Sequence, residues 1–250
     1  MFKGETNLSR NRGAKAQKRM QTVTENTIQF NLQPGTKQRP IELIPKTKNQ
    51  ENLILNLLDA DQHIIVTAGP AGTGKTYLAM LAAVKAFRSG EAKRIVLTRP
   101  AIGVEDEQHG FLPGNLVAKM EPWTRPLLDV LREYYRPAEI TAMIEDGTIE
   151  ISPLAYMRGR TFKHAWIVAD EMQNATPAQM KMLLSRIGTG SRIVVTGDVE
   201  QADRQQGNNG LLDLCLKLEA RPVNGMAVCR MTGRDIQRHP IIGEVLRLYQ

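Results

Sequence analysis

The chain lacks several features that mark particular classes of protein. It has only two cysteines in 250 residues, Cys215 and Cys229, which are far apart and in no metal-binding spacing, so neither a disulfide scaffold nor a zinc site is expected. No apolar run approaches the ~18 residues that a membrane span requires, and the polar N-terminus does not resemble a secretory signal. These features predict a cytoplasmic protein.

Most of the chain carries no net charge. Residues 1–48 hold ten lysines and arginines against three glutamates, and they therefore carry the whole net charge of +7. Residues 1–21 are rich in Lys, Arg, Asn and Gln and poor in apolar side chains, so they cannot bury enough surface to fold alone. We expect a flexible basic arm, which either contacts nucleic-acid phosphates or is a solvated tail without a partner.

The rest of the chain alternates apolar strands with helices. This order predicts an α/β fold, a parallel sheet with helices on both faces. The length allows one such domain, and we expect it over residues 46–250, after an arm and linker over 1–45. Strands are expected at 63–68, 94–98, 148–151, 164–169, 192–196 and 226–231. The alternating segment 22–32 is either a further short strand or a segment that contacts another subunit. Helices are expected at 48–59, 77–87, 117–135 (kinked or restarted at Pro122 and Pro126), 140–143, 177–187, 210–218 and 241–248.

The most specific pattern is GPAGTGKT at residues 69–76, between an apolar strand and an alanine-rich helix. It fits G-x-x-x-x-G-K-[ST], the phosphate loop of nucleotide triphosphatases. Glycines allow the backbone N–H groups to surround a phosphate, and the helix N-terminus attracts the same anion. Lys75 is expected at the β- and γ-phosphates and Thr76 at Mg²⁺. The nucleotide-binding residues predicted here are Gly69, Pro70, Ala71, Gly72, Thr73, Gly74, Lys75, Thr76 and Tyr77.

Three further polar groups are candidates for the same site. Asp170 and Glu171 follow a buried strand, where Asp170 is expected to hold Mg²⁺ and Glu171 to deprotonate a water molecule. Gln201 follows another buried strand and is a candidate γ-phosphate contact, although an acidic turn also explains its segment. Gln50 has an amide suited to an adenine edge, but a surface glutamine is the more common explanation. Ligands bind parallel sheets at the carboxyl ends of the strands.

Arginines near the C-terminus are candidates for an arginine finger. Arg234 and Arg238 lie in the segment GRDIQRHP, and an arginine placed at the γ-phosphate stabilises transition-state charge. A surface ion pair explains either residue equally simply. Arg158 and Arg160 are further candidates for contact with nucleic acid or a neighbouring subunit. Aromatic residues form only 5% of the chain; candidates for base stacking, each more simply explained by core packing, are Trp123, Tyr134, Tyr135 and Tyr156.

These motifs together resemble the PhoH-like ATPase family. The matching stretches are GPAGTGKTYLA, TRPAIGVEDEQHGFLPGNLVAKMEPWTRPLLDVL, ISPLAYMRGRTF, WIVADEMQNATPAQMKMLLSRIG, VVTGDVEQAD and GRDIQRHPIIGEVLRLY, within residues 46–250. GFLPG, PLAYMRGRTF and DEMQN are specific to that family. Small size and the basic arm would suit a phage-encoded member.

The resemblance implies a RecA-like ATPase core similar to that of superfamily 1 helicases. It implies that the strand ending at Gly197 lies between the phosphate-loop strand and the strand before Asp170. It assigns ATP and Mg²⁺ as ligands, Lys75, Glu171, Gln201 and Arg238 as catalytic residues, and Thr76 and Asp170 as metal ligands. Gln50 becomes an adenine contact, and Arg238 is preferred to Arg234 as the finger.

A one-domain chain supplies half of the cleft that superfamily 1 helicases build from two domains. The resemblance therefore implies a homo-oligomeric ring, a hexamer, with Arg238 acting on a neighbouring subunit and with RNA or single-stranded DNA as partner. Two departures stand out: the chain lacks the clustered acids of the PIN nuclease domain that some members append, and the loop at 202–210 differs from the usual pattern.

Two other functions remain open on the sequence. A nucleotide-gated binder would use ATP to switch assembly or RNA contact with little turnover. A small-molecule kinase would use the same phosphate loop, but Asp170-Glu171 followed by Gln173-Asn174 fits hydrolysis better.

Overall fold

A computed structural model describes residues 39–100, 116–201, 209–237 and 241, with side chains from residue 124 onward in the second range. The chain divides into two units, Met1–Gln38 and Arg39–Gln250, and the description concerns the second. The predicted strand at 22–32 and helix at 241–248, apart from Ile241, lie outside the described residues, and so does most of the predicted arm over 1–45.

Six parallel strands form one sheet in the order β3-β2-β4-β5-β1-β6. Strand β5 lies between β1 and β4, which confirms the order implied by the resemblance. Each predicted strand inside the described ranges is present, with ends within two residues of those expected. The strands are β1 (Ile64–Ala68), β2 (Arg94–Thr98), β3 (Ile149–Ile151), β4 (Ala165–Ala169), β5 (Arg192–Gly197) and β6 (Met226–Arg230).

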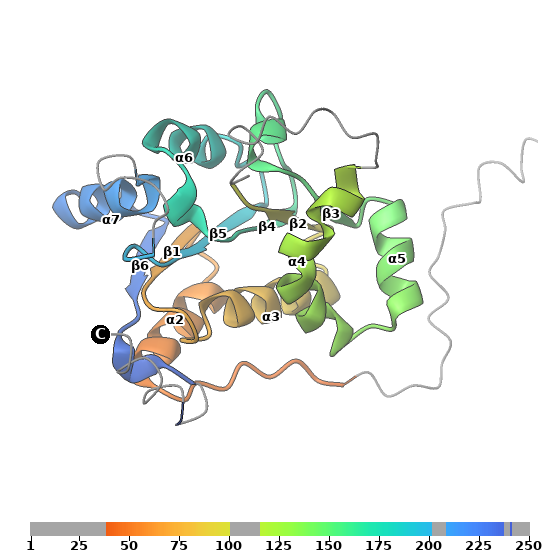
Figure 1. Ribbon diagram of the computed structural model, residues 1–250, viewed down its shortest axis with the longest axis horizontal. Coiled ribbons are helices and arrows are strands. Elements are labelled where there is room, and N and C mark those ends of the chain that lie inside the picture. The colour runs from red at the N-terminus through yellow and green to blue at the C-terminus, as the bar shows by residue number, and fades with distance from the viewer. Residues whose placement is uncertain (1–38, 101–115, 202–208, 238–240, 242–250) are drawn as a thin grey trace, which may run out of the picture. The chain divides into compact units, whose positions relative to one another are not determined.

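Helices cover both faces of the sheet, as the alternating pattern predicted (Figure 1). One face packs against α2 (Lys48–Leu58), α3 (Lys75–Arg88), α4 (Leu116–Arg132) and α5 (Pro137–Glu145). The other packs against α6 (Pro177–Leu184), α7 (Gly210–Ala220) and the short 3-10 helix η1 (Leu154–Met157). Two more 3-10 turns are η2 (Met172–Asn174) and η4 (Gly233–Asp235).

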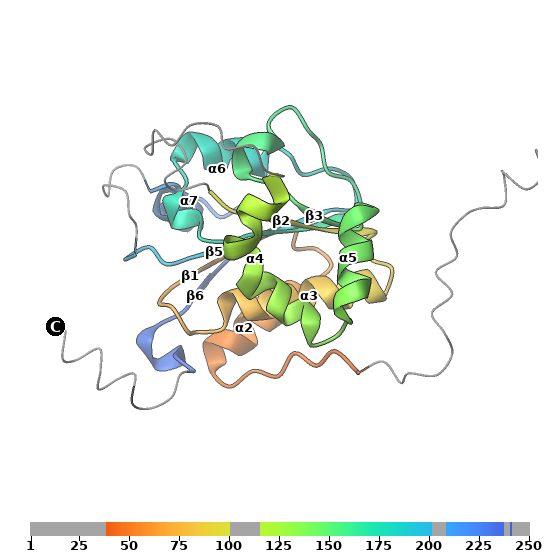
Figure 2. The ribbon, with the colours of Figure 1, turned by 45° about the vertical axis from the view of Figure 1, so that its right-hand side comes forward.

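Alternation along the strands builds two separate hydrophobic cores. In β4, Trp166 and Val168 join the core under α2 and α3, whereas Ile167 and Ala169 join the core under α6 and α7. Successive side chains of a strand point to opposite faces, so one apolar run serves both layers. Figure 2 shows the two helical layers on either side of the sheet.

The two cysteines belong to opposite cores, and neither is a reactive thiol. Cys215 is 0% exposed and Cys229 is 1% exposed. Burial raises the pKa of Cys215, and burial raises that of Cys229 to about 11, although a hydrogen bond from Asn56 opposes the shift. Both thiols therefore stay protonated near neutral pH and pack as small apolar side chains.

Helix α4 confirms the predicted helix and contradicts one part of the prediction. It runs as one helix through Pro122 and Pro126 and does not restart there; a kink at these prolines stays a prediction. A proline inside a helix removes a backbone hydrogen bond and costs about 3 kcal/mol. The second half of α4 offsets that cost by burying Leu127 and Leu131, each 1% exposed or less.

No helix within the described ranges is both long enough and apolar enough to cross a membrane.

Candidate active site

The phosphate loop lies between the carboxyl end of β1 and the start of α3. Gly74 is the N-cap residue of α3 with φ 83°, in the left-handed region that favours glycine. A Cβ atom at this position would lie 3.3 Å from Nε2 of Gln50. The Thr73 hydroxyl donates to the Pro70 carbonyl oxygen at 2.9 Å and closes the turn. The loop therefore presents the N-terminus of a 14-residue helix to the space above the sheet.

Lys75 stands inside this loop. Its side chain is 7% exposed, and Nζ donates to the carbonyl oxygens of Gly69 at 2.6 Å and Pro70 at 2.7 Å. These two carbonyl oxygens hold the ammonium group next to the backbone of the phosphate loop. This arrangement is suited to binding a polyphosphate.

Asp170 joins the phosphate-loop helix to the neighbouring strand end. Its Oδ1 atom accepts hydrogen bonds from the hydroxyls of Thr76, at 2.7 Å, and Thr196. Carboxylate and hydroxyl oxygens are the ligands that Mg²⁺ prefers, so Thr76 and Asp170 fit a magnesium site. Within the described residues no group of three or more His, Cys, Asp or Glu side chains is placed to hold a metal ion.

Glu171 adopts an unusual backbone conformation. Its φ is 54°, in the left-handed region, although it is not glycine. Such a conformation costs about 1–3 kcal/mol and is concentrated at functional sites. One carboxylate oxygen, Oε1, forms an ion pair with Nη2 of Arg99 at 3.1 Å, and the other, Oε2, accepts from the Gln173 amide at 2.5 Å.

A cavity of about 300 Å³ gathers most of the predicted residues. Gln201 reaches it from a turn after β5, in which its backbone N–H donates to the Asp198 carbonyl oxygen at 3.2 Å. The residues that line the cavity are Ala71, Gly72, Gly74, Lys75, Thr76, Tyr77, Asp170, Glu171, Gly197, Asp198 and Gln201.

Gln50 lies behind the loop and does not line the cavity. Its side chain is 4% exposed, and its amide uses both ends: Nε2 donates to the Thr73 carbonyl oxygen at 3.0 Å, and Oε1 accepts from the Lys46 backbone N–H at 2.8 Å. In this structure the two hydrogen bonds of Gln50 connect the phosphate loop to the residues at the start of α2. Its role as an adenine contact stays a prediction.

Tyr77 lines the cavity and directs its hydroxyl to Glu133. The hydroxyl donates to Oε2 of Glu133 at 3.2 Å. Burial, followed by the charge of Glu133, raises the pKa of Tyr77. The phenol is therefore protonated near neutral pH and acts as a hydrogen-bond donor.

The segment before Arg238 is anchored to the same loop. Asp235 is 2% exposed, and its Oδ2 accepts from Nδ2 of Asn49 at 2.7 Å and from the Thr232 backbone N–H at 2.7 Å. The backbone N–H of Gln237 donates to the Gly72 carbonyl oxygen at 2.8 Å. Arg238 itself lies outside the described residues.

Arg234 is exposed and lines a separate pocket of about 760 Å³ at the start of α2.

Of the other two arginine candidates, packing accounts for Arg160. Both of its terminal nitrogens bind the Glu150 carboxylate, and its guanidinium stacks over Phe162 at 4.6 Å. Arg158 is exposed, and so is Tyr156, at 62%. These two residues remain available to a partner.

Two of the other aromatic candidates, Tyr134 and Tyr135, already have contacts within the chain. The rings of Tyr134 and Tyr135 pack against the guanidinium of Arg88, and the Trp123 side chain lies outside the described atoms.

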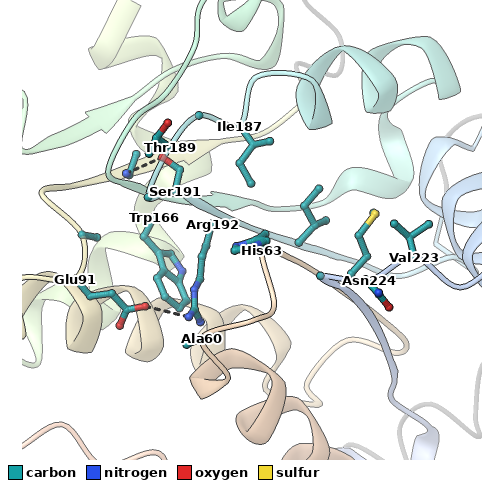
Figure 3. Close-up of a pocket in the computed structure, with 17 residues that line it drawn as sticks. Ala60, His63, Glu91, Trp166, Ile187, Thr189, Ser191, Arg192, Val223 and Asn224 are labelled. Atoms are coloured by element: carbon teal, nitrogen blue, oxygen red, sulfur yellow. Dashed lines mark hydrogen bonds and ion pairs between the residues drawn. The ribbon is translucent and has the colours of Figure 1, made fainter.

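A second cavity, of about 720 Å³, lies at the amino ends of the strands. Figure 3 shows Trp166 beside Arg192, whose guanidinium carbon is 5.3 Å from the ring centre, and Glu91 paired with Arg192 at 3.1 Å. This cavity lies at the opposite edge of the sheet from the phosphate loop. Ligands of parallel sheets bind at the carboxyl edge, so the 300 Å³ cavity is the better nucleotide site.

Two residues contact Glu171 that the sequence analysis did not predict as its partners, Arg99 and Gln173. Arg99 directly follows β2, and the rule that polar groups at strand ends converge would have selected it. Gln173 is 2% exposed. A polar residue two positions after the acid pair was visible in the sequence, but its partners were not.

The Asp235 carboxylate gives a pH-dependent prediction. Burial tends to raise the pKa of Asp235, but hydrogen bonds from Asn49, Thr47 and Thr232 outweigh it, so the pKa lies below 3.8. A carboxyl group with a lowered folded pKa stabilises the fold above its unfolded pKa of about 4, and this contribution is lost as the pH falls through the folded value. Asp235→Asn should therefore cost about 2 kcal/mol at pH 7, and this difference should shrink below pH 4.

Urea unfolding of both proteins at pH 7 and pH 3 measures that difference. The control is Asp213→Asn, which removes a partly exposed carboxylate paired with Lys217 and should cost under about 0.5 kcal/mol. A cost for Asp235→Asn that does not change between the two pH values would contradict the assignment.

Comparison with known proteins identifies the family of the chain. The family described as PhoH-like protein matches residues 42–250. A PhoH-like protein of Synechocystis is 45% identical over 182 residues, covering 73% of this chain and 55% of that protein. A PhoH-like protein of Bacillus subtilis is 42% identical over 204 residues, covering 82% and 63% respectively. The chain thus spans between half and two thirds of the length of these relatives.

Among solved structures, the large terminase of a thermophilic bacteriophage has a TM-score of 0.52 at 10% identity. The match covers 82% of this chain and 50% of that one. Identity at this level shows a shared fold alone. The family match and the relatives carry the assignment: this chain belongs to the PhoH-like protein family.

Proposed function

We propose that this chain is a Mg²⁺-dependent ATPase whose active site is the 300 Å³ cavity above β1, β4 and β5. The observation that carries the proposal is the convergence of Lys75, the Thr76–Asp170 pair, Glu171 and Gln201 on that cavity. These side chains come from separate segments of the chain, and each meets the requirement of one part of phosphoryl transfer. The catalytic domain is assigned to residues 46–250 and a basic arm to 1–45.

Each residue of the proposed site has its own part in ATP hydrolysis. The loop N–H groups and Lys75 bind the β- and γ-phosphates. Thr76 and Asp170 would hold Mg²⁺, which neutralises charge on the phosphate oxygens when bound. Glu171 orients a water molecule and accepts its proton; the water oxygen bonds to the γ-phosphorus, and the bond from that phosphorus to the bridging oxygen breaks, releasing ADP. Gln201 contacts the γ-phosphate.

The complete enzyme is proposed to be an oligomeric ring, a hexamer, with Arg238 completing the site of a neighbouring subunit. The support is the family resemblance.

RNA or single-stranded DNA is the proposed effector of this ATPase, which would translocate on it or remodel it. Support comes from the basic segment at 1–48 and from the exposed pair Tyr156 and Arg158. A cytoplasmic location stays a prediction.

One observation favours the second candidate, a nucleotide-gated switch with little turnover. Both carboxylate oxygens of Glu171 are engaged, by Arg99 and by Gln173. A carboxylate held by these two partners has to turn toward the attacking water before it acts as the base, so turnover without an effector is expected to be slow.

Two substitutions separate binding from chemistry. Glu171→Gln should retain binding of a fluorescent ATP analogue and lower kcat by about 10²–10⁴, because the general base is removed. Lys75→Ala should weaken nucleotide binding itself. The control is Glu219→Gln, which changes an exposed acid paired with Arg230. Phosphate release measures turnover, and a Glu171→Gln protein with wild-type kcat would remove Glu171 from the mechanism.

Nucleic acid should stimulate the ATPase. Single-stranded RNA or DNA should raise kcat, and the stimulation should weaken as salt increases, since phosphate contacts release counterions. Arg158→Ala should raise the concentration of nucleic acid needed for half-maximal stimulation. Its control is Arg132→Ala, an exposed arginine paired with Asp129. Slow hydrolysis indifferent to either nucleic acid, together with ATP-dependent assembly, would favour the switch instead.

A shared active site should allow complementation between inactive subunits. Lys75→Ala and Arg238→Ala proteins should each be inactive alone, and mixing them should restore part of the activity, since some interfaces then pair an intact loop with an intact arginine. Mass measurement must show that both variants assemble. Absence of rescue between assembled variants would contradict action in trans.

A further inference from the structure

Gln173 connects two parts of the active site that are far apart in sequence. Its Nε2 donates to Oε2 of Glu171 at 2.5 Å, and its Oε1 accepts from the backbone N–H of Asp198 at 3.1 Å. A carboxylate only accepts and a backbone N–H only donates, so the two partners fix the orientation of the amide. One buried side chain thus joins the end of β4 to the turn after β5.

The turn after β5 is the one that carries Gln201. Asp198 is 5% exposed, and its carbonyl oxygen accepts from the Gln201 N–H while its Oδ1 accepts from the Glu200 N–H at 3.0 Å. A continuous path of hydrogen bonds therefore runs from the turn of Gln201, through Asp198 and Gln173, to the Glu171 carboxylate.

The backbone is shaped to keep Gln173 in this place. A Cβ atom added at Gly197 would lie 2.5 Å from Oε1 of Gln173, a distance at which something must shift. Gln173 belongs to η2, and the left-handed Glu171 is the N-cap residue of this short helix. The left-handed backbone of Glu171 and the absence of a Cβ atom at Gly197 both allow the Gln173 amide to lie close to its two partners.

We propose that Gln173 is a positioning residue that couples the Gln201 turn to the base Glu171. Contact of the γ-phosphate with Gln201 shifts the Asp198 backbone, and Gln173 passes that shift to the carboxylate, which then aims at the attacking water. Arg99 holds the other carboxylate oxygen, so Gln173 sets which way the group turns. This inference rests on the proposed ATPase activity and adds to it a residue outside the phosphate loop.

Gln173→Met is the first test, because methionine keeps the length of the side chain and loses both hydrogen bonds. We expect kcat to fall about 10- to 100-fold, as for a misplaced base, with the KM for ATP within about threefold of wild type. The matched control is Gln179→Met, which removes another structural amide, the one that accepts from the Thr176 N–H at the start of α6. That variant should lower the melting temperature and leave kcat unchanged.

A second comparison asks whether Gln173 acts through its two partners. In a Glu171→Gln background, Gln173→Met should cause no further loss of kcat, and in a Gln201→Ala background its effect should be smaller than in wild type. Full additivity in both backgrounds would reduce Gln173 to a packing residue and overturn the inference.

Gln173→Glu tests the link to Glu171 alone if the methionine variant does not fold. It keeps an acceptor for the Asp198 N–H but places a second carboxylate against Glu171, where the other charged groups nearby are Lys75, Arg99, Asp170 and Asp198. We expect kcat to fall at least about tenfold at pH 7.5 and part of it to return at lower pH, where two facing carboxylates share a proton.

The outcomes separate the two proposals. A wild-type chain that binds ATP without hydrolysing it would end both the ATPase proposal and this inference. An active wild type with equally active Gln173→Met or Gln173→Glu proteins would overturn the inference alone.

Discussion

The carboxylate of Asp170 is the interaction on which the active site depends. Its Oδ1 atom accepts from hydroxyls on α3 and β5 while its backbone continues β4. The group is 6% exposed, and a buried carboxylate is stable only when hydrogen bonds replace the water that it has lost. Thr76 and Thr196 do so, and they thereby fix the distance between the phosphate loop and the neighbouring strand ends. The parallel register brings these three segments to one edge, and Asp170 holds them there.

Glu171, the next residue, is held in a different way. Asp170 bonds to neutral hydroxyls in a rigid setting, whereas Glu171 is partly exposed and its partners are long side chains, Arg99 and Gln173. A metal ligand benefits from a fixed position, but a base must reorient during the reaction. The contrast between the two adjacent carboxylates matches the different tasks proposed for them.

Much of the fold was predictable because each strand is a short, almost wholly apolar run between polar segments, as in residues 165–169. The convergence of Lys75, Asp170 and Glu171 followed from the same pattern, since carboxyl ends of parallel strands share an edge. The side-chain hydrogen bonds were not predictable. Gln50 and Gln173 are both glutamines at buried positions, yet one braces the phosphate loop and the other joins two motifs. Which partner an amide meets depends on packing between residues more than 20 positions apart, which no local spacing records. The helix through Pro122 and Pro126 was predicted, but the restart expected at these prolines is absent, because tertiary packing outweighs the local cost of proline.

The hydrogen bond from Gln237 to Gly72 ties the end of the described segment 209–237 to the phosphate loop. It fixes the chain, one residue before Arg238, against the phosphate loop of the same subunit. Asp235, bonded to Asn49, holds the preceding residues to the start of α2 in the same way. The segment 232–237 is therefore tied both to the phosphate loop and to α2 of its own chain. Because Gln237 bonds to the backbone of Gly72, a movement of the phosphate loop at Gly72 has to move Gln237 or break this bond.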